Sequence, residues 1–88
     1  MSAKIKLSTV FQSMADNQEY VEVKGNTIRE SLNEFVTKYP DAASWIIDKK
    51  GTLLSFVLLN GEIVNSNDLD KPITEADELY VLPMIDGG

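Results

Sequence analysis

The two glycines that end the sequence, Gly87 and Gly88, are the residues best suited to carry chemistry. The chain contains no cysteine and no histidine. This composition excludes disulfides, thiolate nucleophiles, imidazole metal sites and the catalytic triads or dyads that need either side chain. A terminal carboxylate has a pKa of about 3.5 and is a poor electrophile when it is ionised. Gly88 therefore requires activation before it can react, and the simplest other explanation of the two glycines is a frayed chain end.

The acidic side chains form no recognisable catalytic or metal-binding motif. Residues 65–70 offer several oxygen ligands, but they lack the central glycine and the distal glutamate of an EF-hand loop. We interpret this segment as a solvated loop and expect neither a metal ion nor a bound cofactor. The net charge of −6 opposes binding to phosphate backbones, so we expect no nucleic-acid partner and favour a basic protein surface instead.

No segment of the sequence resembles a membrane anchor. Nowhere do about 18 consecutive apolar residues occur. The start, Met1 to Lys4, leads into an alternating segment and not into the apolar stretch of a signal peptide. We therefore expect no membrane partner and a cytoplasmic location, with which the lack of cysteine is compatible.

Two alternating segments, residues 4–11 and 20–23, predict the first two strands. In the first segment, Ile5, Leu7 and Phe11 follow the period of two that places one face of a strand against a core. Polar residues 13–19 interrupt the pattern, so the two strands are expected to pair as an antiparallel hairpin.

The middle of the chain predicts one long helix and a short helical turn. Thr27-Ile28-Arg29-Glu30 has the form of a capping box, and Pro40 ends the helical pattern that follows it. The apolar stripe of this helix comprises Ile28, Leu32, Phe35, Val36 and Tyr39. Residues 41–47 predict a second, short helical turn capped by Asp41. We interpret Trp45 in this turn as a core residue, with an anchor for a partner as the alternative.

Three segments of the second half predict strands: residues 53–59, 62–64 and 78–83. Asn60-Gly61 favours a type I′ hairpin turn between the first two of them, because both turn positions need positive φ. Two strands, one long helix and then further strands predict an α+β domain of the β-grasp type, with the main helix packed on one face of a mixed sheet. The predicted domain covers residues 1–83, and residues 84–88 form a flexible tail.

Strand alternation divides the apolar residues of the last strands between two faces. If Val57 and Leu59 face the helix, their neighbours face the opposite side of the sheet. The apolar surface predicted there comprises Phe56, Leu58, Tyr80 and Leu82. An exposed surface of this kind is typical of a partner interface, and Met84 and Ile85 would extend it toward the tail. A covered face, or a register shifted by one residue, is the alternative.

Several motifs together point to a known family. They are the helix opening at residues 27–30, the Trp45 turn, the strand and hairpin at residues 57–61, the Pro72-Ile73 stretch, the lead-in at residues 76–79 and the proline-containing tail that ends in Gly87-Gly88. In these features the sequence resembles the MoaD/ThiS family of ubiquitin-like sulfur carriers from Lys4 to Gly88. It departs from MoaD proteins in having Leu82-Pro83 where they often carry two prolines, and in having Asp86 where small residues are frequent.

The resemblance implies that Gly88 is the reacting residue of a carrier that is not itself an enzyme. In such carriers an E1-like adenylyltransferase consumes ATP and attaches AMP transiently to the terminal carboxylate. A sulfur donor protein then displaces AMP and leaves a thiocarboxylate, which serves a larger acceptor enzyme such as a molybdopterin synthase catalytic subunit. The residues expected to be recognised as the tail are Pro83, Met84, Ile85, Asp86 and Gly87. Glycine suits the end of such a tail because a backbone without Cβ atoms passes through a narrow channel.

Three classes of function remain open at this point. A sulfur carrier for molybdopterin synthesis is favoured, with thiamin thiazole synthesis and cysteine synthesis as alternative destinations of the sulfur. A protein modifier would instead join Gly88 to a lysine through an isopeptide bond. A non-covalent binding module would have an incidental tail, so removal of Gly88 would change nothing.

Overall fold

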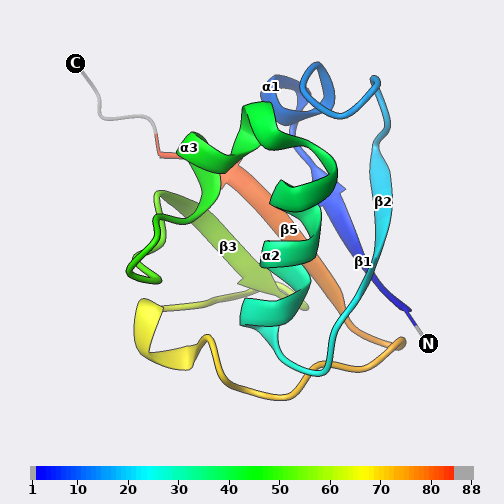
Figure 1. Cartoon of the computed structure of the whole chain (residues 1–88). Coiled ribbons are helices and arrows are strands. Elements are labelled where there is room, and N and C mark those ends of the chain that lie inside the picture. The colour runs from blue at the N-terminus through cyan, green and yellow to red at the C-terminus, as the bar shows by residue number, and fades with distance from the viewer. Residues whose placement is uncertain (1, 85–88) are drawn as a thin grey trace.

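The computed structural model describes residues 2–84, which form a five-stranded mixed sheet with one long helix on one face (Figure 1). The strands are β1 (Ser2–Leu7), β2 (Tyr20–Lys24), β3 (Ser55–Leu59), β4 (Glu62–Ile63) and β5 (Glu78–Pro83). Their order in the sheet is β2-β1-β5-β3-β4, in which β1 and β5 are parallel and the other neighbours are antiparallel. This arrangement confirms the predicted α+β, β-grasp fold.

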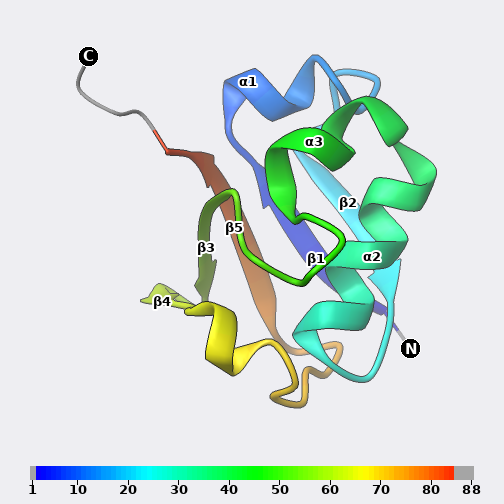
Figure 2. The same ribbon diagram turned by 60° about the vertical axis from the view of Figure 1, so that its left-hand side comes forward.

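The helical elements lie mainly on one side of the sheet, as the turned view in Figure 2 shows. They are α1 (Thr9–Gln12), α2 (Ile28–Lys38) and α3 (Ala43–Ile46), with the 3₁₀ turns η1 (Pro40–Ala42) and η2 (Ser66–Asp68). Only α2 is long enough to cover the sheet. The other helical segments close the ends of the core.

The start of α2 is fixed by side chains that satisfy its free backbone donors. Thr27 Oγ1 accepts a hydrogen bond from the Glu30 N–H at 3.1 Å. The Glu30 carboxylate accepts one from the Asn26 N–H at 2.7 Å, one residue earlier than the capping box predicts. The predicted helix is thus confirmed within one residue at each end.

The apolar stripe of α2 packs on the sheet as the periodicity predicts. Ile28, Leu32 and Phe35 are fully buried, and Val36 and Tyr39 are partly buried against them. The sheet contributes the inward-facing side chains of alternate strand positions, namely Ala3, Ile5, Leu7, Val21, Val23, Val57, Leu79 and Val81. The stability of the domain depends on this contact because no disulfide is possible.

Leu32→Ala is expected to lower the free energy of unfolding by about 2–5 kcal/mol, because the removed atoms leave a cavity in a close-packed core. Leu32 is completely buried between α2 and the sheet. Urea denaturation of the two proteins measures the difference. Asn33→Ala, an exposed neighbour on the same helix, is the control and should change the free energy by less than about 0.5 kcal/mol. A loss of the same small size for Leu32→Ala would contradict this packing.

The first strand is shorter than the alternating pattern predicts. β1 ends at Leu7, and residues 9–12 form α1. The Ser8 carbonyl accepts hydrogen bonds from the N–H groups of Phe11 and Gln12, both at 3.0 Å. Leu7 and Phe11 are four residues apart, a spacing that also suits one face of a helix. The predicted strand over residues 4–11 is therefore wrong in its second half, although Phe11 is buried as expected.

Residues 40–47 form helical turns, but two predictions about them are wrong. Asp41 caps no helix: η1 begins at Pro40, and neither η1 nor α3 has a side-chain cap. Trp45 is not a core residue, because 53% of it is exposed. In a helix of a single turn only one side can face the core, and Ala42 and Ile46 occupy that side.

Both strands of the predicted hairpin at Asn60-Gly61 are shorter than the apolar pattern of the sequence predicts. β3 begins at Ser55 and not at residue 53, since the Leu54 N–H bonds to the Ile46 carbonyl at 2.8 Å. β4 ends at Ile63, one residue early. The turn itself agrees with the prediction, because Asn60 has φ 50° and Gly61 has φ 90°.

Asp77 ties the turn before β5 to this hairpin. Its carboxylate accepts hydrogen bonds from Asn60 Nδ2 at 2.9 Å and from the Thr74 N–H at 2.8 Å, and these bonds lower the pKa of Asp77. A carboxyl whose pKa is lower in the folded chain than in the unfolded one stabilises the fold above its unfolded pKa of about 3.9. That contribution is lost as the pH falls through the folded value.

Asp77→Asn is therefore expected to unfold more easily than the unchanged protein at pH 7. The difference should begin to narrow below about pH 4, where the Asp77 carboxyl of the unfolded chain becomes protonated, and should continue to narrow as the pH falls through the lower folded pKa. Urea denaturation at pH 7 and at pH 3 measures both effects. An equal difference at the two pH values would mean that the charge of Asp77 contributes nothing.

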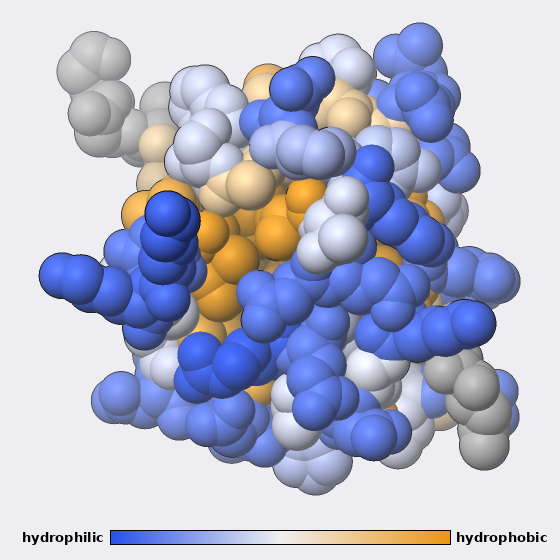
Figure 3. Space-filling view, viewed as in Figure 1, coloured by the Kyte–Doolittle hydropathy of each residue, from blue (hydrophilic) through white to orange (hydrophobic). Residues whose placement is uncertain are grey.

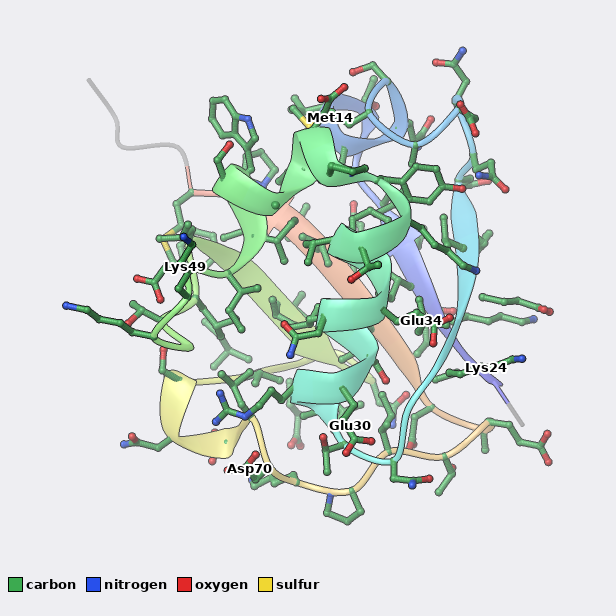
Figure 4. The ribbon with its side chains drawn as sticks, in the orientation of Figure 1. Met14, Lys24, Glu30, Glu34, Lys49 and Asp70 are labelled. Atoms are coloured by element: carbon green, nitrogen blue, oxygen red, sulfur yellow. The ribbon has the colours of Figure 1, made fainter. Side chains whose placement is uncertain are left out.

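The outer edge of β2 is covered by side chains of α2. Glu34 lies toward Lys24 in Figure 4, and its carboxylate accepts a hydrogen bond from the Lys24 N–H at 2.9 Å. Lys38 Nζ donates to the Glu22 carbonyl at 3.2 Å. An edge whose backbone groups are already paired is protected against the addition of another strand. The free surface of the sheet is consequently its face, not this edge.

Candidate functional site

The face of the sheet turned away from α2 carries the side chains predicted as a partner interface. Phe56 lies directly opposite Leu82, and Leu58 lies opposite Tyr80. Paired residues of neighbouring strands point to the same face, so these four side chains form one surface, which we call the open-face patch. Val57 is fully buried on the other face. The predicted register is confirmed, whereas the use of the patch by a partner is a proposal.

The open-face patch is wider than the sequence predicts. Ile63 lies opposite Leu58 and is 57% exposed, so it extends the patch onto β4. On the other side, Lys6 lies opposite both Tyr80 and Tyr20. Its Nζ atom is 5.3 Å from the centroid of the Tyr80 ring and 5.9 Å from that of the Tyr20 ring. Both distances are within the range of a cation–π contact, so the ammonium group of Lys6 lies near two aromatic rings.

Sequence reasoning missed Lys6 and Ile63, but a signal for Lys6 was present. Ile5 and Leu7 point inward, so alternation along β1 places Lys6 on the open face. Its pairing with two tyrosines depends on which strands neighbour β1, and the sequence does not give that order. Ile63 carried no such signal because a two-residue strand has no periodicity.

The open face changes in character along β5. At the start of the strand, Lys4 lies between two acidic residues, opposite Glu22 and opposite Glu78. At the end of the strand, Leu82 and Phe56 replace these charges with apolar surface. The apolar end is therefore the one from which the chain leaves the sheet toward Gly88.

The chain leaves the sheet through Pro83 and Met84. Pro83 lies opposite Ser55 at the last position of the ladder. The fixed φ of proline limits the directions in which the following residues can depart. Met84 is exposed and lines a shallow hollow with Phe56 and Ile63. The other predicted tail residues, Ile85, Asp86, Gly87 and Gly88, lie outside the described residues.

Two carboxylates with lowered pKa values lie in loops and are not themselves part of the open-face patch. Arg29 Nε donates to Asp70 Oδ1 at 2.9 Å, and this bond lowers the pKa of Asp70. Asp77 is the other carboxylate with a lowered pKa, which results from its hydrogen bonds with Asn60 and Thr74. Within residues 2–84, no group of three or more histidine, cysteine, aspartate or glutamate side chains is arranged to hold a metal ion. Over the same residues, no helix is long and apolar enough to cross a membrane.

A sequence model of the ThiS family matches residues 5–88, which is nearly the whole chain and includes both terminal glycines. The chain belongs to the ThiS family. No curated protein matches the sequence. The family assignment confirms the resemblance that the sequence motifs indicated.

Solved structures show how far the fold of this ThiS-family chain is shared. SAMP1 from Haloferax volcanii is 27% identical, with a TM-score of 0.81 and complete coverage of both chains. A chain of the Amycolatopsis orientalis BexX/CysO complex is 21% identical, with a TM-score of 0.83 over 98% of this chain and 99% of that one. A chain of the complex of subunits 1 and 2 of the Helicobacter pylori molybdopterin-converting factor is 19% identical, with a TM-score of 0.66 over all of both chains. The ThiS-family chain thus has the fold of ubiquitin-like sulfur carriers.

Proposed function

We propose that this chain is a sulfur carrier whose reacting group is the Gly88 carboxylate. The observation that carries the proposal is the family match, which extends through the terminal glycines. An oxygen of the carboxylate attacks the α-phosphorus of ATP on an E1-like adenylyltransferase, and pyrophosphate leaves. The terminal sulfur of a persulfide on a donor protein then attacks the acyl carbon of Gly88, and AMP leaves. A second thiol cleaves the sulfur–sulfur bond that still joins Gly88 to the donor and is itself oxidised to a disulfide. The product is a thiocarboxylate, the form in which the sulfur is carried.

The carrier's own contribution is to present the tail and to be recognised. The open-face patch adjoins the point where the chain leaves the sheet, so a partner that binds the tail meets this patch next. Apolar and aromatic side chains are the usual anchors of a protein interface. ATP is consumed by the partner, and AMP is attached to the carrier only transiently. Because activation requires ATP, we place the reaction in the cytoplasm.

Molybdopterin synthesis is the destination that we place first for the sulfur. The length of the chain and the Trp45 turn resemble MoaD carriers. The acceptor would then be the larger, catalytic subunit of a molybdopterin synthase. Thiamin thiazole synthesis and cysteine synthesis are the alternatives, and the Leu82-Pro83 form of the tail resembles carriers of the cysteine pathway.

A protein modifier is the second candidate function. SAMP1, whose name denotes a small archaeal modifier protein, matches this chain over the whole length of both at 27% identity. A modifier shares the activation step with a carrier, but the Gly88 acyl group is then transferred to the amine of a lysine. The two functions differ only in the nucleophile that displaces AMP.

Mass spectrometry of cell extracts distinguishes these two functions in one digest. Glu78 is the last glutamate of the sequence, so a protease that cleaves after glutamate releases residues 79–88 as one peptide. A sulfur carrier yields this peptide with a terminal thiocarboxylate, about 16 Da heavier than the carboxylate because sulfur replaces oxygen. A modifier yields residues 79–88 joined to lysines of other proteins. Finding only the joined form would reject the carrier function.

A further inference from the structure

Trp45 lies exposed on α3, next to the place where the chain leaves the sheet. It is the only tryptophan of the chain and is 53% exposed. Its carbonyl accepts a hydrogen bond from Ser55 Oγ. Ser55 in turn lies opposite Pro83, the last residue of β5. Two direct contacts therefore connect Trp45 to the base of the tail, and Figures 1 and 2 show α3 and the end of β5 at the same end of the molecule.

A shallow apolar hollow, which Trp45 does not itself line, lies between α3 and the residue that precedes β3. Leu54, which precedes Ser55 and is 38% exposed, lines this hollow together with Ala43 and Ile47. Asp48 and Lys49 form its charged rim and carry opposite charges, so the hollow favours an apolar ligand and not a charged one. Lys49 is seen on the loop after α3 in Figure 4. We call Trp45, Leu54 and this hollow the tail-root patch.

The tail-root patch and the open-face patch lie on opposite sides of the same end of the sheet. Phe56 belongs to the open face, whereas α3 lies on the side that carries α2. Figure 3 shows the helix-bearing side as largely hydrophilic, with apolar side chains gathered between α2 and α3, over β3. Exposed apolar surface thus flanks the base of the tail on both sides. Trp45 and Leu54 lie outside the buried core, so the packing of the fold does not account for these two apolar side chains.

The length of the tail determines how close an enzyme must come. Five residues, Met84 to Gly88, follow Pro83. Fully extended, they span about 17 Å. An enzyme that acts on the Gly88 carboxylate must hold these residues in a channel no deeper than this. The rim of that channel then rests against the end of the sheet.

We propose that the enzyme that adenylates Gly88 contacts Trp45 and Leu54 with an apolar part of its channel rim, and so holds the end of the sheet from both faces. The inference rests on the proposed function, in which Gly88 is activated. The activating enzyme is the occupant because activation precedes both sulfur transfer and lysine modification. A half-exposed tryptophan is the type of side chain that most often dominates the binding energy of an interface.

Kinetics of adenylation test the proposal with the full chain. The carrier-dependent exchange of pyrophosphate into ATP, catalysed by the E1-like enzyme of the same organism, gives KM for the carrier and kcat. Trp45→Ala is expected to raise KM by about 10- to 30-fold, as an anchor residue does, with kcat at saturation nearly unchanged. Trp45→Phe should retain most of the affinity. Asn33→Ala, an exposed substitution on α2, is the control and should leave both constants unchanged.

A second measurement needs no substitution at Trp45. The chain carries one tryptophan, so incorporation of 5-fluorotryptophan gives a single ¹⁹F resonance from this position. Adding the unlabelled enzyme should shift or broaden this resonance, also with a carrier that lacks Gly88. An unchanged resonance under conditions where the enzyme adenylates the full carrier would overturn the inference and leave the proposed function intact.

The remaining outcomes also decide the question. If Trp45→Ala leaves KM unchanged but alters the sedimentation of the carrier alone, the patch is a contact between copies of this chain. If it raises KM only for the acceptor enzyme, the patch belongs to that later step. Both results overturn the proposal. If the enzyme does not adenylate the unchanged carrier at all, the proposed function itself fails, which the kinetics show before any variant is compared.

Discussion

Deleting Gly88 is expected to abolish thiocarboxylate formation while leaving the fold unchanged. The shortened chain ends about 3.5 Å before the position of the activated phosphorus. Reacting atoms must approach to about 3–3.5 Å, so a displacement of this size removes the reaction and does not merely slow it. Intact-protein mass spectrometry after incubation with the E1-like enzyme, ATP and a sulfur donor measures the effect. The described core is formed by residues from Ala3 to Val81, so the fold is expected to tolerate loss of the last residue.

Two further measurements show whether the loss of activity comes from the length of the tail or from a loss of domain stability. Adding one glycine after Gly88 moves the terminal carboxylate by a similar distance in the other direction. The lengthened protein should therefore also form no thiocarboxylate. Thermal denaturation should give the same midpoint for all three lengths. Sulfur on the shortened protein would show that the Gly88 carboxylate is not the reacting group.

Leu58→Asp is expected to weaken binding to the activating or acceptor enzyme by about 30-fold or more, the effect of removing a central anchor. Leu58 lies in the middle of the open-face patch, between Tyr80 and Ile63. A carboxylate placed there must be desolvated when the partner binds. The melting midpoint should remain nearly unchanged, because the side chain faces away from α2. Calorimetric titration and thermal denaturation of the same variant measure the two quantities.

Val57→Asp is the matched control for this substitution. Val57 is the preceding residue of β3 and is fully buried on the helix side. The same change should therefore prevent folding there, since it buries an unpaired charge. If Leu58→Asp instead unfolds the domain and the remaining folded fraction binds normally, Leu58 is a core residue and the assignment of the two faces is wrong.

The parts of the fold that the sequence predicted correctly are those fixed by local signals. α2 begins at a capping Thr27 and ends before Pro40, and both features act within a few residues of the helix end. The Asn60-Gly61 turn requires positive φ at both residues, which few sequences other than Asn-Gly accept easily. The bounds of β5 follow from a turn before it and a proline at its end. Each of these elements is determined by its own residues.

The errors occur where tertiary contacts decide between two local structures. Residues 8–11 suit a strand or a helical turn equally, and the hydrogen bond from the Ser8 N–H to the Val81 carbonyl at 3.3 Å involves a strand far along the chain. Trp45 is apolar and lies in an amphipathic turn, so hydrophobicity alone predicts burial. Its exposure depends on which side of α3 faces the core, and Ile46 occupies that side.

The candidate site was predictable only in the strands that alternate regularly. Phe56, Leu58, Tyr80 and Leu82 were placed correctly because the alternation of β3 and β5 determines which side each residue faces. Lys6 joins them through the parallel pairing of β1 with β5. Such pairing between distant segments has no local signature, and this is why the lysine between two tyrosines appears only in the structure.

Reconstitution of the sulfur-transfer reaction tests the central claim most directly. The purified carrier is incubated with the E1-like enzyme of its own organism, ATP and a sulfur donor, and its intact mass is recorded. We expect a gain of about 16 Da when all components are present, and an adenylate on Gly88 when the donor is omitted. Without ATP the mass should not change. Failure of the carrier to form an adenylate with any E1-like enzyme of its organism would contradict the claim that Gly88 is the reacting group.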